Sequence, residues 1–423
     1  PPQDRALLVG APLKRAGARR AAQEHLRELE RLADTAGANV VGELTQQLDR
    51  PHPATYLGSG KLDELRAKIG ETGATLIIFD DELSPSQAKN VEDAVGQRVV
   101  DRAELILDIF ATRARSAEAR MQVELAQLEY MLPRLTRMWT HLEKFRGGIG
   151  VRGPGETQLE TDRRLISHRI KLLRERLRDV EKSRAVQRQS RKGEFRASLV
   201  GYTNAGKSSV LRRLAAASDV FVEDRLFATL DPLTREVDLG EHAHALVTDT
   251  VGFIRKLPHH LVASFRATLE ETRDADLLLH VIDASHPQWE EQKQVVDQVL
   301  VELGFQDRPV LLVFNKTDLL DEDALLALQA RMHDLAPGAI FVTTVTDDGL
   351  DPLRRALTTA VRSRRPIAEV RLAHGDGRLL AEIHRSGEVL EQRADDDELV
   401  VVARLDAALA GRQRQAGARV TPV

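Results

Sequence analysis

The chain has 423 residues, of which 30% are charged and 42% hydrophobic. This length predicts two to four domains of ordinary globular composition, and no apolar run is long enough to span a bilayer. The lack of cysteine excludes disulfides, thiol catalysis and cysteine-ligated zinc, and it fits a reducing compartment. The chain opens with Pro1 and Pro2, without a methionine or a signal-peptide pattern, so we expect a processed or truncated cytoplasmic protein.

The net charge of −4 hides a basic block within an acidic chain. Residues 111–193 hold 20 Lys and Arg against 10 Asp and Glu, a net of +10, which leaves −14 for the rest. Such a block favours a polyanionic partner such as RNA, because phosphate contacts dominate affinity for nucleic acids. A solvated helical face with charges of alternating sign gives the same count, so composition leaves both explanations open.

Residues 1–110 alternate short apolar runs with amphipathic stretches, a pattern typical of an α/β domain with parallel strands. The strands are expected at 6–10, 39–44, 75–81 and 98–102, and the helices at 21–37, 58–70 and 84–95. The stretch "ATYLGSGK", which ends at Lys61, resembles a phosphate loop at the start of a helix but lacks the full motif. We favour a tight turn there over a second nucleotide site.

A basic helical arm is expected over residues 111–193. One continuous helix is predicted from about Leu105 to Phe145, with Pro133 ending or kinking it. A glycine-rich loop at 147–157 then leads into a second charged helix from residue 161, which makes a helical hairpin. Arg146 and Arg152 are candidate RNA contacts, because the glycines around them would let the backbone approach phosphates closely. An ordinary linker is the alternative.

Residues 194–365 predict a second α/β domain, with strands at 195–201, 244–250, 276–285, 309–315 and 339–345. A small α+β domain is expected at 366–423, where strand, helix, strand and strand run to about Leu405 and a polar tail follows.

The stretch "GYTNAGKS" is a complete phosphate-loop motif between an expected strand and an expected helix. Its residues are Gly201, Tyr202, Thr203, Asn204, Ala205, Gly206, Lys207 and Ser208. The backbone N–H groups of such a loop surround phosphates, Lys207 reaches the β- and γ-phosphates, and the Ser208 hydroxyl is a ligand for Mg²⁺. We therefore expect nucleotide binding with Mg²⁺ as cofactor.

Two further motifs follow at strand ends. Asp249, Thr250, Val251 and Gly252 form the first, in which Asp249 would hold Mg²⁺ through water and the Gly252 N–H would sense the γ-phosphate. Asn315, Lys316, Thr317 and Asp318 form the second. The Asp318 carboxylate accepts two hydrogen bonds from guanine, which adenine cannot donate, so it predicts GTP and GDP as ligands in preference to ATP.

A mobile switch is expected between these motifs, at Phe227, Ala228, Thr229, Leu230 and Asp231. Thr229 is the candidate that joins Mg²⁺ through its hydroxyl and closes on the γ-phosphate, with Thr234 as its competitor. We assign the catalytic roles to Lys207, Thr229 and Gly252. The loop behind the guanine is expected at Thr343, Thr344 and Val345.

Phe253 stands where GTPases often carry a polar residue that orients the attacking water. An apolar side chain cannot orient water. Either a partner completes the site and intrinsic hydrolysis is slow, or Phe253 packs in a switch helix while another residue positions the water.

The expected fold class is therefore α/β. It comprises an N-terminal α/β domain with a basic helical-hairpin arm, a P-loop GTPase domain with a mainly parallel sheet, and a small C-terminal α+β domain.

The quoted motifs, together with the arm segments "QVELAQLEYMLPRLTRMW" and "RGGIGVRGPGETQLETDRR" and the early "IIFDDELSPSQ", resemble the HflX GTPases over residues 5–365. The resemblance implies a cytoplasmic GTPase whose N-terminal domain and arm engage the large ribosomal subunit, and which separates stalled ribosomes into subunits. GTP would favour binding and hydrolysis would permit release. The family also carries an apolar residue at the position of Phe253, which implies that the ribosome completes the site. We expect a monomer.

The chain departs from the family in two places: Thr343-Thr344 replaces the usual Ser-Ala, and Ser209-Val210 follows the loop serine where Thr-Leu is usual. Two other functions stay open. One is a GTP-controlled protein-interaction switch that docks another protein through the arm. The other is ATP-dependent RNA remodelling through a second nucleotide site near Gly58 and Lys61.

Overall fold

The computed structural model describes residues 3–14, 18–135, 154–189, 194–216, 226–240, 243–257, 261, 270–395 and 398–423. The chain forms two compact units that interleave in sequence. Unit 1 is made of Pro1–Ser183, Glu223–Asp231 and Ile254–Thr268, and unit 2 of Arg184–Val222, Pro232–Phe253 and Leu269–Val423. Two segments of the predicted GTP-binding domain therefore belong to unit 1. No helix in the described part of the chain is long and apolar enough to cross a membrane.

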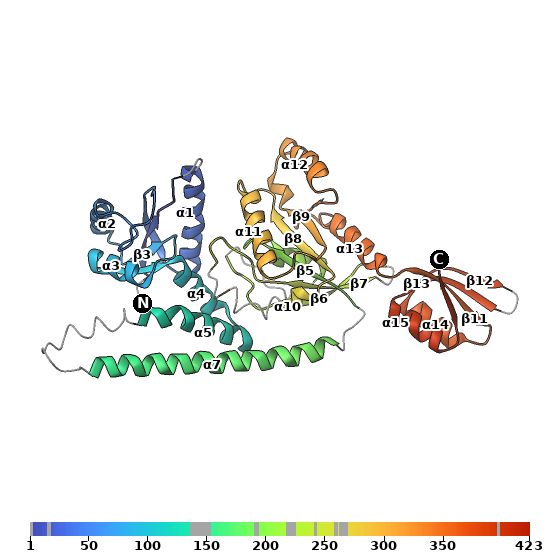
Figure 1. Cartoon of the computed structure of the whole chain (residues 1–423). Helices are drawn as coiled ribbons and strands as arrows, with labels where there is room; N and C mark the ends of the chain where they lie inside the picture. Colours follow the sequence, from blue (N-terminus) through green and yellow to red (C-terminus); the bar gives the residue numbers. More distant parts are fainter. Residues whose placement is uncertain are drawn as a thin grey trace. The chain divides into compact units, whose positions relative to one another are not determined.

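Unit 1 begins with a four-stranded parallel sheet of order β2-β1-β3-β4. The strands are β1 (Arg5–Gly10), β2 (Asn39–Thr45), β3 (Leu76–Phe79) and β4 (Arg98–Asp101), and the helices are α1 (Ala18–Thr35), α2 (Ser59–Thr72) and α3 (Pro85–Val95) (Figure 1). Leu7, Ile77 and Val91 are fully buried between sheet and helices. The start of α3 is set locally, because Ser84 and Gln87 cap each other's backbone N–H groups. The alternating pattern predicted this layer correctly.

The continuous helix expected from Leu105 is wrong. Helix α4 (Arg102–Arg113) ends at Arg113, and α5 (Ala117–Met131) begins after Ser116. The Ser116 hydroxyl accepts a hydrogen bond from Ala119 N at 3.0 Å, so it caps a new helix in the middle of the helical pattern. Pro133 ends α5 as predicted, since the 3-10 turn η1 (Leu132–Arg134) follows directly.

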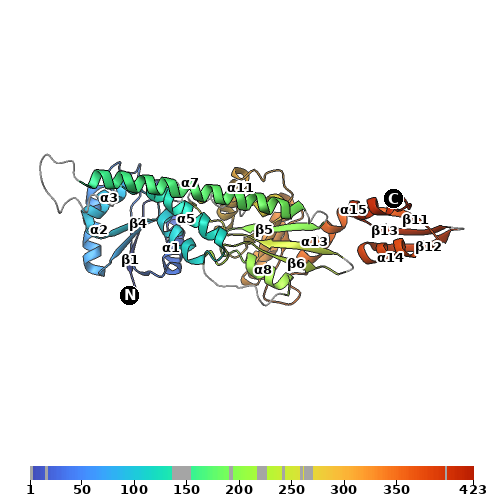
Figure 2. The same cartoon turned by 90° about the horizontal axis from the view of Figure 1, so that it is seen from below.

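The second arm helix, α7 (Pro154–Gln189), begins inside the range expected as glycine-rich loop. It lies beside α5 in two perpendicular views (Figures 1 and 2). Leu125 of α5 is buried with Ile170 and Leu173 of α7. Arg169 donates two hydrogen bonds to the carboxylate of Glu124, at 2.6 and 2.8 Å, which fixes the register of the pair. The candidate RNA contacts Arg146 and Arg152 lie outside the described residues.

Unit 2 contains a six-stranded sheet of order β10-β9-β8-β5-β7-β6. Its strands are β5 (Phe195–Gly201), β6 (Leu233–Asp238), β7 (His244–Asp249), β8 (Leu277–Asp283), β9 (Val310–Asn315) and β10 (Ile340–Phe341). All pairs are parallel except β6 with β7, which is antiparallel. The sequence prediction missed β6. Charged residues interrupt the apolar alternation of "LTREVD", so the strand is defined by its pairing with β7 more than by its pattern.

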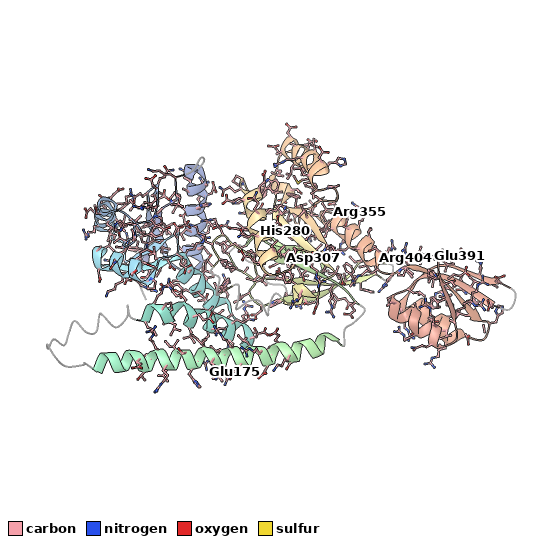
Figure 3. All side chains as sticks on the ribbon, viewed as in Figure 1. Glu175, His280, Asp307, Arg355, Glu391 and Arg404 are labelled. Carbon is pink, nitrogen blue, oxygen red and sulfur yellow. The ribbon has the colours of Figure 1, made fainter. Side chains whose placement is uncertain are left out.

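Helices α8 (Lys207–Leu214), α10 (Glu270–Arg273), α11 (Trp289–Glu302), α12 (Glu322–Leu335) and α13 (Asp351–Ser363) accompany this sheet, with the short turn η2 (Thr317–Leu319) after β9. His280 is buried at the centre of β8, with its Nδ1 3.4 Å from a carboxylate oxygen of Asp297 on α11 (Figure 3). Burial lowers the pKa of His280, so the ring is neutral at physiological pH.

The chain ends in an antiparallel sheet of order β12-β13-β11-β14. Its elements are β11 (Ile367–Ala373), α14 (Gly377–Ser386), β12 (Glu388–Asp395), β13 (Glu398–Arg404), α15 (Ala407–Gln415) and β14 (Arg419–Pro422). The predicted polar tail is wrong. Asp406 caps α15 by accepting a hydrogen bond from Leu409 N at 2.7 Å, and β14 pairs with β11. Two apolar positions, Leu409 and Val420, anchor this otherwise polar segment in the core.

Candidate nucleotide site

The phosphate loop joins β5 to α8 and depends on two glycines. A Cβ atom at Gly206 would lie 2.2 Å from Asn315 Nδ2, and the residue has a φ of +95° that favours glycine. At Gly201 a Cβ atom would lie 2.3 Å from the backbone oxygen of Val281. The loop therefore packs against the ends of β8 and β9, which is why glycine is required at both positions.

Lys207 begins α8 and is only 6% exposed. Its Nζ donates to the backbone oxygens of Gly201, at 3.3 Å, and Tyr202, at 3.0 Å. Burial lowers the pKa of Lys207 from 10.5 to about 8, and the charge of Asp249 acts in the opposite direction. The ammonium group is thus fixed inside the loop, where an arriving phosphate would restore its preference for the charged form.

This pKa predicts how GTP affinity depends on pH. Below about pH 8 the lysine is charged in the free protein, so binding takes up no proton and the affinity is flat. Above pH 8 Lys207 is mostly neutral in the free protein and must take up a proton before it can bind the phosphates as an ammonium group. The affinity for GTP should therefore fall by about tenfold per pH unit. Titration of GTP binding from pH 7 to 9.5 tests this. Lys207→Arg keeps its charge throughout and should show no such fall; a wild-type profile that matches it would contradict the prediction.

Ser208 and Asp249 lie together beside the loop. The Ser208 hydroxyl donates to Asp249 Oδ2 at 2.6 Å, and Asp249 is 0% exposed at the end of β7. Thr250 fixes this strand end, because its hydroxyl donates to the backbone oxygen of Leu199 at 2.7 Å. A hydroxyl and a carboxylate are hard oxygen donors of the kind that Mg²⁺ prefers. Two such donors would leave the other positions around an ion to phosphate oxygens and water. The described residues contain no cluster of three acidic or histidine side chains that could hold a metal.

The backbone of Gly252 and Phe253 lies against the phosphate loop. Phe253 N donates to Gly201 O at 3.0 Å, and Thr203 N donates to Phe253 O at 2.6 Å. A Cβ atom at Gly252 would lie 2.7 Å from Thr203 Cα and 3.1 Å from Lys207 Nζ. The Phe253 residue is 1% exposed and forms a β-bridge with Tyr202, so it does not sit in a switch helix.

The residues predicted to select guanine lie at the ends of β9 and β10. Asn315 Nδ2 donates to Ala205 O at 3.0 Å, which connects the base site to the phosphate loop. The Thr317 hydroxyl donates to Val342 O at 3.0 Å. The Thr343 hydroxyl donates to Asp318 Oδ1 at 2.5 Å and accepts from Val345 N at 3.1 Å. Threonine at 343 therefore supports the carboxylate that would select guanine, and the substitution for serine keeps this contact.

Asp283 contacts the predicted base site, and the sequence prediction did not include it. It accepts a hydrogen bond from Lys316 Nζ at 2.7 Å. Asp283 ends β8 as Asp249 ends β7. Because carboxyl ends of neighbouring parallel strands meet at one edge of a sheet, its position in "HVIDAS" was the signal that could have identified it.

The predicted switch belongs to unit 1. Phe227 has a φ of +56° and its ring centroid is 4.6 Å from that of Phe110. Asp231 accepts hydrogen bonds from the backbone N of Arg115, at 3.1 Å, and of Ser116, at 3.2 Å. Thr229 lies half-buried between these anchors, and its role as a metal ligand stays a prediction.

Its competitor, Thr234, has another partner. The Thr234 hydroxyl is 2.8 Å from that of Thr248 on the neighbouring strand, so it belongs to the β6–β7 pairing. On helix α2, Lys61 pairs with Glu64 at 2.8 Å, and no observation among the described residues favours a second nucleotide site there.

These features define a P-loop GTP-binding protein. Family models match three consecutive parts of the chain: "GTP-binding GTPase N-terminal" at residues 23–111, "GTP-binding GTPase Middle Region" at 113–191 and "50S ribosome-binding GTPase" at 196–316. The GTPase HflX of Magnetococcus marinus is 46% identical over 412 residues, which cover 97% of this chain and 94% of that protein. The GTPase HflX of Escherichia coli (strain K12) is 45% identical over 376 residues, 88% of each chain. The chain belongs to the HflX family of GTPases.

Among solved structures, a GTP-binding protein from Sulfolobus solfataricus in complex with GDP is 23% identical, covers 85% of this chain and 99% of its own, and gives a TM-score of 0.45. A likeness this distant adds nothing to the assignment.

Proposed function

We propose that the protein is a Mg²⁺-dependent cytoplasmic GTPase that binds the large ribosomal subunit as a monomer, splits stalled ribosomes, and hydrolyses GTP faster on the ribosome. The observation that carries the proposal is Phe253. It is buried and follows the γ-phosphate sensor Gly252 directly, so this position supplies no polar group for the attacking water. A group supplied from outside would complete the site, and such a group is worth about 10³ to 10⁵ in rate in other GTPases.

Ser208 and Asp249 would hold the Mg²⁺, with Thr229 added when the switch closes. The bound ion would neutralise charge on the β- and γ-phosphates. Lys207 would bind the same phosphates, and the Gly252 N–H would donate a hydrogen bond to the γ-phosphate when it is present. Asp318, oriented by Thr343, would restrict the site to guanine.

The arm supports a ribosomal RNA partner. Helix α7 carries exposed cationic residues along its length, namely Arg163, Arg164, Lys171, Arg174, Arg176, Arg178 and Lys182. Acidic residues such as Glu175 are interspersed among them (Figure 3). Contacts of such side chains to phosphates release counterions, so binding through this face should weaken steeply as salt rises.

GTP turnover with and without large ribosomal subunits tests the proposal. We expect the subunits to stimulate turnover at least about tenfold, because they complete a site that lacks a water-orienting residue. Lys207→Ala, which removes the phosphate-binding ammonium group, should show no stimulated turnover. Sedimentation of intact ribosomes with the protein and GTP should show separated subunits.

Unchanged turnover in the presence of large subunits would contradict the proposal. If the arm bound a protein partner, and if this binding did not weaken as salt rises, the result would instead support a protein-interaction switch.

A further inference from the structure

The two carboxylate oxygens of Asp283 have different partners. Oδ1 accepts hydrogen bonds from the backbone N of Ser285, at 3.0 Å, and from the Ser285 hydroxyl, at 2.6 Å. Oδ2 accepts from Lys316 Nζ at 2.7 Å, across the ends of the adjacent parallel strands β8 and β9. An aspartate bonded to the backbone two residues further on is fixed in a local turn. The turn therefore sets the orientation of the carboxylate and leaves one oxygen for the lysine.

Lys316 is held at both ends of its side chain. Its backbone has a φ of +63°, a left-handed conformation that is unfavourable for residues other than glycine, and the adjoining Thr317 hydroxyl donates to Val342 O at 3.0 Å. The ammonium group is bound to Asp283, and the side chain is only 25% exposed. Between these two ends, Cε lies 4.0 Å from the position that a Cβ atom would take at Gly206. The methylene groups of the lysine therefore run beside the phosphate loop.

Lys316 lies within the segment predicted to bind the base. Asn315, before it, is tied to the phosphate loop through Ala205 O, and Asp318, after it, is oriented by the Thr343 hydroxyl. A lysine whose charged end is fixed presents its methylene groups as an apolar surface. Without a partner the same side chain would sample many rotamers, and a base that bound against it would have to order them.

An ordinary surface ion pair is the competing explanation, and such pairs contribute little. The Asp283 side chain, however, is only 14% exposed, and its carboxylate is fixed by Ser285 before the lysine is considered. The left-handed backbone at Lys316 is a second difference, because strained residues persist where the surrounding structure holds them and gather at binding sites. Both observations favour a role in binding.

We propose that Asp283 is a positioning residue of the nucleotide site, which holds Lys316 in place so that the purine ring lies against its methylene groups. The proposal rests on the base site at Asn315–Asp318 that the proposed function assigns. Because the Asp283–Lys316 pair acts on the base and not on the phosphates, it supports GDP and GTP equally.

A double-mutant cycle in the full chain tests the proposal. Asp283→Ala removes the anchor, Lys316→Met removes the ammonium group but keeps an unbranched apolar stem, and a third variant carries both changes. Affinities for GDP and for a non-hydrolysable GTP analogue are measured by titration without ribosomes. Glu290→Ala is the matched control, because its carboxylate is also paired with a cation of unit 2, Arg331 at 2.5 Å, outside the predicted site.

We expect Asp283→Ala to lower the affinity for both nucleotides by about threefold to tenfold, because an unanchored lysine must be ordered on binding. Lys316→Met should cause a similar loss. The double variant should bind no more weakly than the weaker single variant, because Asp283 then has no lysine to hold. Glu290→Ala should leave both affinities unchanged.

A purely structural role for Asp283 gives a different result. Loss of the turn at Ser285 would weaken binding equally with and without the lysine, so additive losses in the cycle would overturn the proposal. Asp283→Asn keeps the turn, since its amide oxygen can still accept from Ser285 N, and it should lose affinity as Asp283→Ala does. It decides the matter if Asp283→Ala does not fold, and an unchanged affinity would then overturn the proposal.

A loss confined to one of the two nucleotides would place the pair at the phosphates and overturn its role at the base. Lys207→Ala reports on the phosphate loop independently. Undiminished nucleotide binding by Lys207→Ala would overturn the proposed site as a whole. A loss of binding in Lys207→Ala, with unchanged affinities in both Asp283 variants, would overturn the role of Asp283 alone.

Discussion

Lys207→Ala should lower kcat/KM for GTP by about a thousandfold or more. The ammonium group would make charge-assisted hydrogen bonds to the phosphates, each worth about 1.5–3 kcal/mol. Loss of a preorganised group that stabilises developing charge costs a further factor of about 10² to 10³ in kcat. Single-turnover kinetics and nucleotide titration separate the two losses.

The free protein should not be destabilised by Lys207→Ala through the charge itself. Burial disfavours the ammonium form, as the lowered pKa of Lys207 shows. Removal of the charge therefore relieves a penalty that is fully present below about pH 8 and disappears as the pH rises towards 10.5. Thermal melting of the nucleotide-free variant checks this. Lys171→Ala, at an exposed position on α7, is the matched control and should retain wild-type turnover. A fall of less than tenfold in kcat/KM for Lys207→Ala would refute its assigned role.

Asp318→Asn should change which base the site accepts. In the predicted role, the carboxylate would accept two hydrogen bonds from guanine. An asparagine amide would instead present a donor to the guanine 2-amino group, which is itself a donor and would be left unpaired. We expect GTP affinity to fall by about 10³ and a xanthine nucleotide, whose 2-oxo group accepts from the amide, to bind better than GTP. Competition between the two nucleotides against a fluorescent GDP measures this.

Thr343→Ala provides the control for this experiment. It removes the hydroxyl that donates to Asp318 Oδ1 at 2.5 Å but keeps the carboxylate, so affinity for GTP should fall by only about threefold to tenfold. Guanine should still be preferred over xanthine. A variant of Asp318 that still prefers guanine would show that another group selects the base.

The strand–helix alternation was predictable because it depends on local sequence, and so was the place of the phosphate-loop, Asp249–Gly252 and Asn315–Asp318 motifs at the ends of β5, β7 and β9. Their elements begin and end at glycines, caps and strand ends that the sequence displays. The polar C-terminal segment was not predictable in this way, because Leu409 and Val420 join the core only after β14 has paired with β11. The break at Ser116 was overlooked, although its capping serine is visible in the sequence.

No sequence pattern indicated that residues 226–231 and 254–257 belong to unit 1. Both lie between motifs of the GTP site, yet Phe227, Asp231 and Arg255 make their contacts with residues more than a hundred positions earlier in the chain. Contacts at such separation depend on how the two units fold, not on local propensity. Two cations directly after an apolar run, as in "FIRK", are the sequence signal of this kind in the chain.

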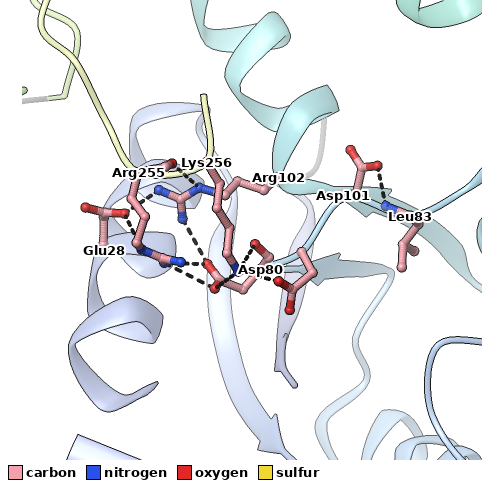
Figure 4. Close-up of polar contacts among 8 residues, drawn as sticks. Glu28, Asp80, Leu83, Asp101, Arg102, Arg255 and Lys256 are labelled. Atoms are coloured by element: carbon pink, nitrogen blue, oxygen red, sulfur yellow. Dashed lines mark hydrogen bonds and ion pairs between the residues drawn. The ribbon is translucent and has the colours of Figure 1, made fainter. Parts of the chain in front are cut away.

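The interleaving of the units has a consequence for how the chain is made. Residues 1–183 leave the ribosome first, and of the three cations that pair with Asp80 in the folded unit (Figure 4) they contain Arg102. The other two, Arg255 and Lys256, emerge more than seventy residues later. Synthesis at about 5–20 residues per second leaves several seconds in which the N-terminal unit is unfinished. A gene truncated after residue 193 would express this unfinished form permanently.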